Sequence, residues 1–154
     1  MKQILKTIAS LLKGFNYAIG GSISLSANGI IHRQPKDIDI VLDRAALARL
    51  SWSGEFSEVP TYTDHDWHVR FLHNDHFVCC FVSDDIKLQP KKDIVFMGVL
   101  LPIAHPYCTI QAKEAVLREI YANPPLTPDR KAQRDKHIAD IEAWDRYTSR
   151  SSQF

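Results

Sequence analysis

The sequence predicts an α+β domain (mixed α/β), in which a mixed β-sheet is covered by helices. Apolar residues recur every three or four positions at both ends of the chain, which is helical spacing, whereas the middle holds short segments typical of strands. No internal repeat and no long linker separates these segments. We therefore expect a single domain over residues 1–154, with an N-terminal helix over 1–14 and a polar tail over 149–154.

The composition is that of a globular protein without a strong charge. The chain has 154 residues, of which 45% are hydrophobic and 24% charged, and its formal net charge is +1. Such a balance does not require a nucleic-acid partner, so any binding of a polyanion must be local to a site. No segment approaches the 18 or more apolar residues of a membrane span. The three cysteines, two of them adjacent, form a poor disulfide framework. We expect a soluble, cytoplasmic protein with no membrane partner.

The first half of the chain predicts helices and strands around a glycine pair. The segment 37–42 alternates polar and apolar residues before it becomes wholly apolar, as in a strand that enters a core. The expected elements are a helix over 1–14, a strand over 15–19, a short helix over 23–30 that ends near Asn28-Gly29, a strand over 37–42, a helix that Asp43 caps and that ends at Leu50, and a loop over 51–65.

The second half predicts two hairpins followed by two helices. Prolines set the helix boundaries, because a proline is tolerated in the first turn of a helix and cannot continue one. The expected elements are strands over 67–72 and 77–82 joined by a turn at 73–76, strands over 94–97 and 99–103 around Gly98, a helix from His105-Pro106 to about Tyr121, and a last helix that begins at Thr127-Pro128-Asp129.

The residues that predict a chemistry are a glycine pair and an acidic pair. Asp37 and Asp39 are two positions apart on a predicted strand, so both carboxylates point to the same face. Paired carboxylates suit Mg²⁺, which takes one or two protein carboxylates together with substrate phosphates. Gly20 and Gly21 lie at a strand-to-helix turn, where backbone N–H groups can approach a phosphate closely. Ser22 could cap the helix and donate a hydrogen bond to a phosphate oxygen.

This pattern, Gly-Gly-Ser, then Arg33, then Asp-Ile-Asp-Ile, resembles the signature of the DNA polymerase beta-like nucleotidyltransferase superfamily. It is most similar to the small bacterial enzymes of the minimal, aminoglycoside and abortive-infection types. The segment 98–106 resembles the family's late hairpin, which precedes a proline-started helix that carries a lysine, here Lys113. The segment 134–141 resembles its basic-and-acidic last helix. The resemblance covers about residues 15–145.

The resemblance implies the nucleotidyltransferase fold, two Mg²⁺ ions and transfer of a nucleoside monophosphate. A nucleoside triphosphate such as ATP would donate the group to a hydroxyl or phosphate of an acceptor, which is a small molecule, a protein side chain or an RNA end. Gly20, Gly21 and Ser22 would hold the phosphates, and Asp37 and Asp39 would be the catalytic metal ligands. The remaining nucleotide-binding residues, Arg33 and Lys113, would neutralise phosphate charge.

One departure from the family pattern concerns the third carboxylate, which the family carries on a later strand. The matching strand is 77–82, and a cysteine, Cys79 or Cys80, stands where the carboxylate is expected. Asp75, Asp84 and Asp85 lie at the ends of this strand. Loss of general-base assistance costs about 10²–10⁴-fold in rate. The alternative function is therefore a catalytically impaired member of the fold that acts as a nucleotide sensor or a protein-interaction module.

Simpler interpretations of the same residues stay open. Arg33 could pair with Asp37 or Asp39 where no metal is bound, and Lys113 could be a solvated lysine on the polar face of its helix. A second copy of the chain could complete an open cleft, which would make the protein a homodimer.

The histidines around the 73–76 turn permit a second hypothesis. Zinc takes histidine and aspartate ligands, and the segments 65–68 and 73–76 supply four imidazoles and two carboxylates. Their spacing matches no established zinc pattern. His68 could instead face the acidic pair and accept a proton. The adjacent cysteines Cys79 and Cys80 must point to opposite faces of their strand, so one of them is expected in the core.

Overall fold

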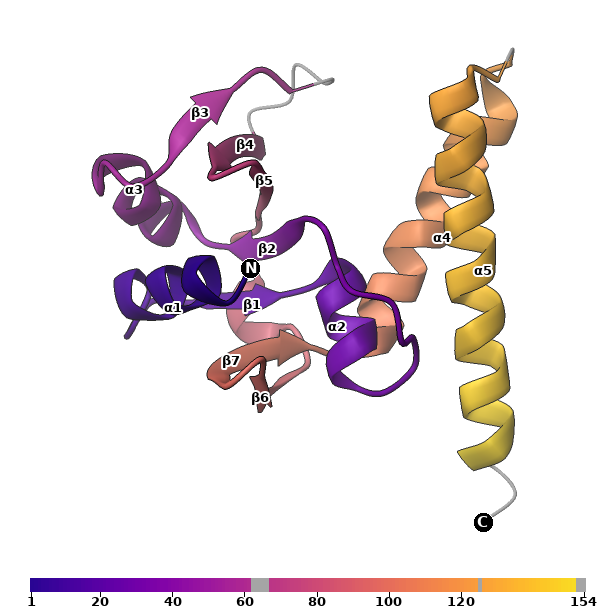
Figure 1. Cartoon of the computed structure of the whole chain (residues 1–154), viewed down its shortest axis with the longest axis horizontal. Helices are drawn as coiled ribbons and strands as arrows, with labels where there is room; N and C mark the ends of the chain where they lie inside the picture. The colour runs from indigo at the N-terminus through magenta and orange to yellow at the C-terminus, as the bar shows by residue number, and fades with distance from the viewer. Residues whose placement is uncertain (62–66, 125, 152–154) are drawn as a thin grey trace.

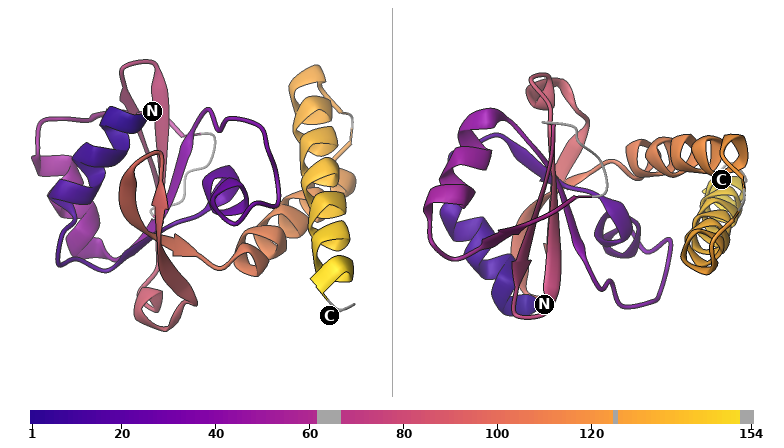
Figure 2. Two further views of the ribbon diagram at one scale, coloured as in Figure 1. Left: turned by 60° about the horizontal axis from the view of Figure 1, so that its bottom comes forward. Right: turned by 90° about the horizontal axis from the view of Figure 1, so that it is seen from above.

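The computed structural model describes residues 1–61, 67–124 and 126–151, and shows a sheet with helices on both faces (Figures 1 and 2). The helices are α1 (Lys2–Leu11), α2 (Gly21–Ala27), α3 (Arg44–Trp52), α4 (Pro106–Ala122) and α5 (Pro128–Ser151), with a short 3-10 helix η1 (Ile86–Leu88). The strands are β1 (Tyr17–Ile19), β2 (Ile38–Leu42), β3 (Ser57–Val59), β4 (His68–His73), β5 (His76–Val82), β6 (Lys91–Phe96) and β7 (Val99–Ala104). The predicted α+β class is confirmed.

Seven strands of the described residues form one mixed sheet in the order β3-β4-β5-β2-β1-β7-β6. The central strand β2 is antiparallel to β1 and parallel to β5. Because β1 and β2 run in opposite directions, the end of β1 lies beside the start of β2, and Ile19 pairs with Ile40. This pairing brings the glycines that follow β1 next to the acidic residues that begin β2.

The two faces of the sheet differ in chemistry. Ile38, Ile40 and Leu42 of β2 are fully buried on one face, which α1 and α3 cover (Figure 2). Asp39 and Val41 alternate with them and so point to the other face, where α2 and α4 lie. The first face therefore holds the main core, and the second is available for a site.

Helices α4 and α5 pack side by side and extend from the second face of the sheet (Figure 1). Ile110 of α4 is buried with Leu25 of α2 and with Ile30 and Ile31, and Trp144 of α5 packs against this small second core. The helix pair is therefore fixed to α2 and to the loop after it, so it has a defined position relative to the sheet.

Several predicted boundaries are confirmed by their local interactions. The Asp43 carboxylate accepts a hydrogen bond from the Ala46 N–H at 2.9 Å, as an N-cap should. The Thr127 hydroxyl accepts one from the Arg130 N–H at 3.2 Å at the start of α5. The 73–76 hairpin turns through Asn74 and Asp75, whose φ angles of 45° and 66° are those of a two-residue type I′ turn.

Other boundaries differ from prediction. The segment 51–65, expected as a loop, contains the end of α3 and the edge strand β3, whose three residues are too few for alternation to be recognised. Strand β2 begins at Ile38, so Asp37 precedes it. Helix α5 continues through 149–151, which the sequence assigned to a polar tail, and 152–154 lie outside the described residues. In the described part of the chain, no helix is long and apolar enough to cross a membrane.

Candidate active site

The glycine pair meets Asp39 where β1 ends and β2 begins. The Gly20 N–H donates a hydrogen bond to the Asp39 carbonyl oxygen at 2.8 Å. Gly21 has a φ of +58°, and a Cβ atom on it would lie 2.9 Å from Asp39 Cγ and overlap the carboxylate. A side chain at this position is excluded both by backbone conformation and by the carboxylate itself. The backbone after β1 therefore lies directly against the Asp39 side chain.

The environment of Asp39 makes its ionised form costly. Burial raises the pKa of Asp39 above its usual range and Asp37 adds repulsion, while the charges of Lys113 and Lys136 oppose this shift. Asp37 is exposed, directly before β2. Among the described residues, no group of three or more His, Cys, Asp or Glu side chains could hold a metal ion, so the donor set here is this pair of carboxylates. Such a pair fits Mg²⁺ when substrate phosphates supply further oxygen ligands.

Cys79 occupies the position beside Asp39 on the neighbouring strand. In the parallel β2–β5 pairing, Asp39 is the register partner of Cys79, and on the other side of β5 Cys79 is opposite Arg70. Burial, and then the negative charge of Asp39, raises the pKa of the Cys79 thiol to about 12, so the thiol stays neutral. Cys80 is buried on the opposite face, as the alternation of side chains predicts.

A cavity of about 480 Å³ lies between this face of the sheet and helices α4 and α5. The residues of α4 that line the cavity are three or four positions apart and so lie on one face of this helix. The lining residues are Gly20, Gly21, Asp39, Val41, Phe81, Gln89 and Ala104 from the sheet and its loops, Cys108, Thr109, Ala112, Lys113 and Val116 from α4, and Gln133 and His137 from α5. Four of the predicted site residues, two glycines, an aspartate and a lysine, therefore line one cavity.

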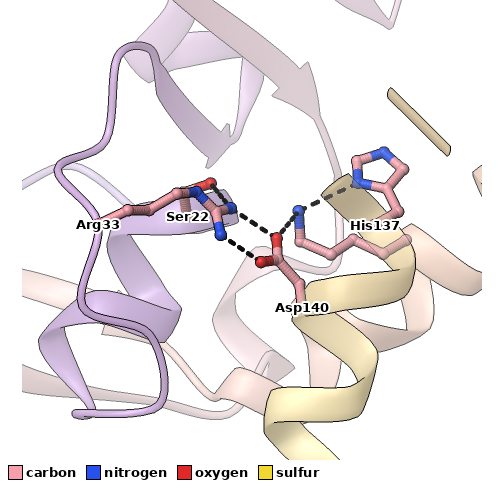
Figure 3. A network of polar contacts seen from close by, with 5 residues as sticks. Ser22, Arg33, His137 and Asp140 are labelled. Atoms are coloured by element: carbon pink, nitrogen blue, oxygen red, sulfur yellow. Dashed lines mark hydrogen bonds and ion pairs between the residues drawn. The ribbon is translucent and has the colours of Figure 1, made fainter. Parts of the chain in front are cut away.

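A buried ion-pair network joins the predicted cations to α5 (Figure 3). The Arg33 guanidinium donates two hydrogen bonds to the Asp140 carboxylate, at 2.5 and 2.7 Å, and one to the Ser22 hydroxyl at 3.2 Å. The Lys113 ammonium lies 3.0 Å from the same carboxylate and 3.4 Å from His137 Nδ1. Asp140 is fully buried and Lys113 nearly so. This network fixes α5 to α4 and to the loop that carries Arg33.

The pKa values in the network follow from burial and from the closely spaced charges. Burial would raise the pKa of Asp140, but the hydrogen bonds and charges of Arg33 and Lys113 outweigh it, and the pKa lies below its usual range. Burial, and then the charge of Lys113, lowers the pKa of His137 to about 4, so its imidazole is neutral. Partial desolvation, then repulsion from Arg33 and Lys113, lowers the pKa of Lys136. Arg33 and Lys113 share the Asp140 carboxylate, and Lys136 lies near enough for their charges to affect its pKa.

The network corrects three expectations. Arg33 pairs with Asp140 and not with Asp37 or Asp39. Lys113 is buried in an ion pair and is not a solvated lysine. Ser22 does not cap α2, because the helix begins at Gly21 and the Ser22 hydroxyl lies inside its first turn.

Sequence reasoning missed Asp140 and His137, which are three positions apart and therefore share one face of α5. An aspartate of a basic helix looks like a solvated surface charge, and only the tertiary fold brings it to Arg33 and Lys113. The resemblance of 134–141 to the family's last helix was the one available signal.

Three histidines of the β4–β5 hairpin each contact a different partner. His68 stacks on Phe81 with ring centroids 4.7 Å apart, His73 packs on Phe56 at 5.1 Å, and His76 Nδ1 lies 2.9 Å from the Lys36 carbonyl oxygen. His65 and Asp66 lie outside the described residues. The residues described here contain no zinc cluster.

Solved structures share this architecture. A Thermotoga maritima protein assigned as a nucleotidyltransferase aligns over 79% of this chain and 87% of its own, with a TM-score of 0.61 and 18% identity. The chain has the nucleotidyltransferase fold. The antibiotic-resistance factor ANT(2'')-Ia covers 99% of the chain with 91% of its own length, at a TM-score of 0.54 and 15% identity. Its complex with adenylyl-2''-tobramycin gives a TM-score of 0.53 at 14% identity. No protein-family model and no curated protein sequence matches the chain.

The contact of Gly21 with Asp39 predicts a specific cost for a methyl group. Gly21→Ala must adopt the same positive φ and also displace the Asp39 carboxylate, so we expect a larger loss of stability than at a glycine with open space. Gly54→Ala is the matched control, because Gly54 has a φ of +76° and nothing within 4 Å of its added Cβ. Urea unfolding should show about 1–2 kcal/mol lost in the control and at least about 2 kcal/mol more in Gly21→Ala. Equal losses would contradict the contact.

The buried network predicts that Asp140→Asn is strongly destabilising. The change leaves the buried Lys113 without its carboxylate, so we expect a loss of about 3–5 kcal/mol at pH 7, against a small change for the exposed Asp145→Asn on the same helix. Because the folded-state pKa of Asp140 is lowered, its contribution is present above its unfolded pKa and is lost as the pH falls through the folded value. The difference between Asp140→Asn and wild type should therefore shrink in acid. A difference that is constant from pH 7 to pH 2 would refute this assignment.

Proposed function

We propose that the protein binds a nucleoside triphosphate with Mg²⁺ in the cavity and transfers a nucleoside monophosphate to an acceptor, with pyrophosphate as the leaving group. The observation that carries the proposal is the contact of the Gly20-Gly21 backbone with the Asp39 carboxylate, at the edge of a cavity that Lys113 also lines. A backbone without side chains, a carboxylate and a cation are thereby brought to one place, which supports the binding of phosphate and metal proposed here. These are the parts that phosphoryl-transfer chemistry needs.

Each group of the chain has a defined task in this proposal. Gly20 and Gly21 have no side chains, so their backbone admits a phosphate close to the acidic pair. Asp37 and Asp39 would hold Mg²⁺, which when bound neutralises phosphate charge and polarises the phosphorus that is attacked. Lys113 and Arg33 supply positive charge beside the phosphates, and Asp140 keeps both side chains in fixed positions.

The electrostatics support binding of a polyanion. Burial disfavours the charged form of Asp39, and a bound cation would remove this penalty. The cations Arg33, Lys113 and Lys136 lie near three carboxylates, those of Asp37, Asp39 and Asp140. A Mg²⁺ ion on the acidic pair would therefore leave the site with a net positive charge, which favours binding of a triphosphate.

The proposal specifies the accepting atom, an oxygen, and not the molecule that carries it. ANT(2'')-Ia has been solved in complex with adenylyl-2''-tobramycin, so in that complex a small molecule carries the adenylyl group. For this chain we propose transfer to an oxygen atom of an acceptor, whether in a small molecule, a protein side chain or an RNA end. The reaction forms one phosphorus–oxygen bond to the acceptor and breaks the bond between the α- and β-phosphates.

A second candidate function is nucleotide binding with little or no transfer. Cys79 favours it, since a neutral thiol beside Asp39 neither accepts the acceptor's proton nor offers a hard ligand for Mg²⁺. Such a protein would act as a nucleotide sensor, with the glycine pair and the acidic pair intact. The two candidates share one binding site and differ in turnover.

The acidic pair should be required for nucleotide binding. In a thermal melt with Mg²⁺, a nucleoside triphosphate at about 100 times its dissociation constant should stabilise the wild-type protein by about 2.7 kcal/mol, or several degrees. EDTA should abolish the shift, and so should Asp37→Asn combined with Asp39→Asn.

The exposed pair Asp84→Asn and Asp85→Asn is the matched control and should retain the shift. A shift of the same size in the Asp37 and Asp39 variant would refute the proposed site. A folded wild-type protein that no triphosphate stabilises would refute nucleotide binding.

A carboxylate at position 79 should raise turnover. Cys79→Asp places a possible proton acceptor beside Asp39, so release of pyrophosphate from labelled triphosphates should increase by about 10²-fold or more, within the range of general-base catalysis. Cys79→Asn is the control, because it has nearly the same shape and stays neutral. Measurable wild-type turnover, above that without enzyme and as fast as that of Cys79→Asp, would show that the thiol does not impair the site and would exclude the second candidate.

A further inference from the structure

Gln89 lines the cavity and carries a hydrogen-bond acceptor that has no partner among the described residues. Its side-chain oxygen is buried and has no hydrogen-bond partner among the residues that the structure describes, and the residue lines the cavity. A buried polar atom without a partner is rare in folded proteins, because it loses its hydrogen bonds to water and gains none. This oxygen is almost inaccessible in the unliganded protein, whereas the residue as a whole is only half-buried, so a ligand in the cavity would satisfy it once the Gln89 side chain turns toward the cavity.

The backbone holds Gln89 in place on both sides. The Gln89 N–H donates to the Ile86 carbonyl oxygen at 3.2 Å, and Ile86 is buried under Ala18 and Ala104 of the sheet. The next residue, Pro90, accepts a hydrogen bond from the His105 N–H at 2.9 Å. Gln89 thus joins η1 to the start of β6 at a fixed position beside the end of β7.

The wall of the cavity around Gln89 is apolar and includes an aromatic ring. The ring of Phe81 stacks on His68, with the two planes only 10° apart, and Phe81 also lines the cavity. The apolar lining residues are Val41, Phe81, Ala104, Cys108, Ala112 and Val116. A polyhydroxylated ligand would bury its hydroxyl groups against this wall without partners, whereas a flat heterocycle would bury apolar ring faces.

We propose that Gln89 reads the base of the nucleotide: its side-chain oxygen accepts a hydrogen bond from an exocyclic amino group, as in adenine, while Phe81 and Val116 pack against the ring. This inference rests on the proposed function, since the same cavity contains Gly20 and Lys113 at its phosphate end. Its volume of about 480 Å³ lies within the range of sites for small ligands.

A neutral donor suits the Gln89 oxygen better than a cation does. Gln89 offers one neutral oxygen, and the lining also contains the apolar side chains of Val41, Phe81 and Val116. An ammonium group at Gln89 would find this one acceptor, and its other N–H groups would face apolar lining without partners. The amino group of adenine is uncharged and donates a hydrogen bond, so it satisfies Gln89 without adding charge.

The test compares ATP with purine riboside triphosphate, in which a hydrogen replaces the exocyclic amino group. Inosine triphosphate would be a poorer probe, because its carbonyl could accept a hydrogen bond from the amide nitrogen of the same glutamine. With Mg²⁺, titration calorimetry of the wild-type protein should give about tenfold tighter binding of ATP. Gln89→Leu should bind both nucleotides equally, and weaken mainly ATP binding.

Gln111→Leu is the matched control, since Gln111 is exposed on α4 outside the cavity, and it should keep the tenfold preference. Equal wild-type affinities for both nucleotides, with binding lost in the Asp37→Asn, Asp39→Asn variant, would overturn the role of Gln89 and leave the proposed function intact. If neither nucleotide binds the folded wild-type protein, both the role of Gln89 and the proposed function are overturned. The wild-type comparison decides the question even if Gln89→Leu does not fold.

Discussion

The site depends on one close contact, between the backbone of Gly21 and the carboxylate of Asp39. The contact exists because β1 and β2 are antiparallel neighbours, so that the chain leaves β1 just where β2 begins. The Gly20 N–H fixes the spacing through its bond to the Asp39 carbonyl oxygen, and the absence of a Cβ atom at Gly21 permits the approach. The remaining strands of the core face and helices α1 and α3 bury the apolar side chains of β2 and thereby hold Asp39 on the opposite face. The fold thus holds β2 so that its apolar side is buried in the core and its other side presents Asp39 to the site.

The second constraint is the Asp140 carboxylate, which links three segments far apart in the sequence. Arg33 follows α2, Lys113 belongs to α4 and Asp140 to α5, and no local interaction would bring them together. A fully buried carboxylate is costly unless it is paired and hydrogen-bonded, and here a bidentate guanidinium and an ammonium satisfy it. The same pairing fixes α5 as the outer wall of the cavity. The Asp140 carboxylate therefore both positions the cavity wall and holds Arg33 and Lys113 in place.

The sequence was sufficient for the fold class and for the elements that carry the glycine pair and Asp39, because these depend on local patterns. Alternation in 37–42, the capping by Asp43 and the Asn74-Asp75 turn are each fixed by neighbouring residues, and each is confirmed. The partners of Arg33 and Lys113 were not predictable, since Asp140 is distant in sequence and lies in a helix rich in charged residues. The short strand β3 and the unpartnered side-chain oxygen of Gln89 also could not be predicted from the sequence. Both arise from tertiary packing, and neither has a periodic signal.

The pairing of Asp39 with Cys79 shows how binding and turnover can separate on this fold. A third carboxylate at Cys79 would repel Asp39, whose ionisation burial already disfavours, and the site would then need a bound cation to stay folded and charged. A neutral thiol removes that repulsion, and Arg70 on the next strand lies opposite the thiol. The glycine pair, the cations and the cavity wall are untouched by the exchange. In the proposed function, the groups that would hold a nucleotide are residues other than Cys79, whereas position 79 would affect metal ligation and the loss of the acceptor's proton.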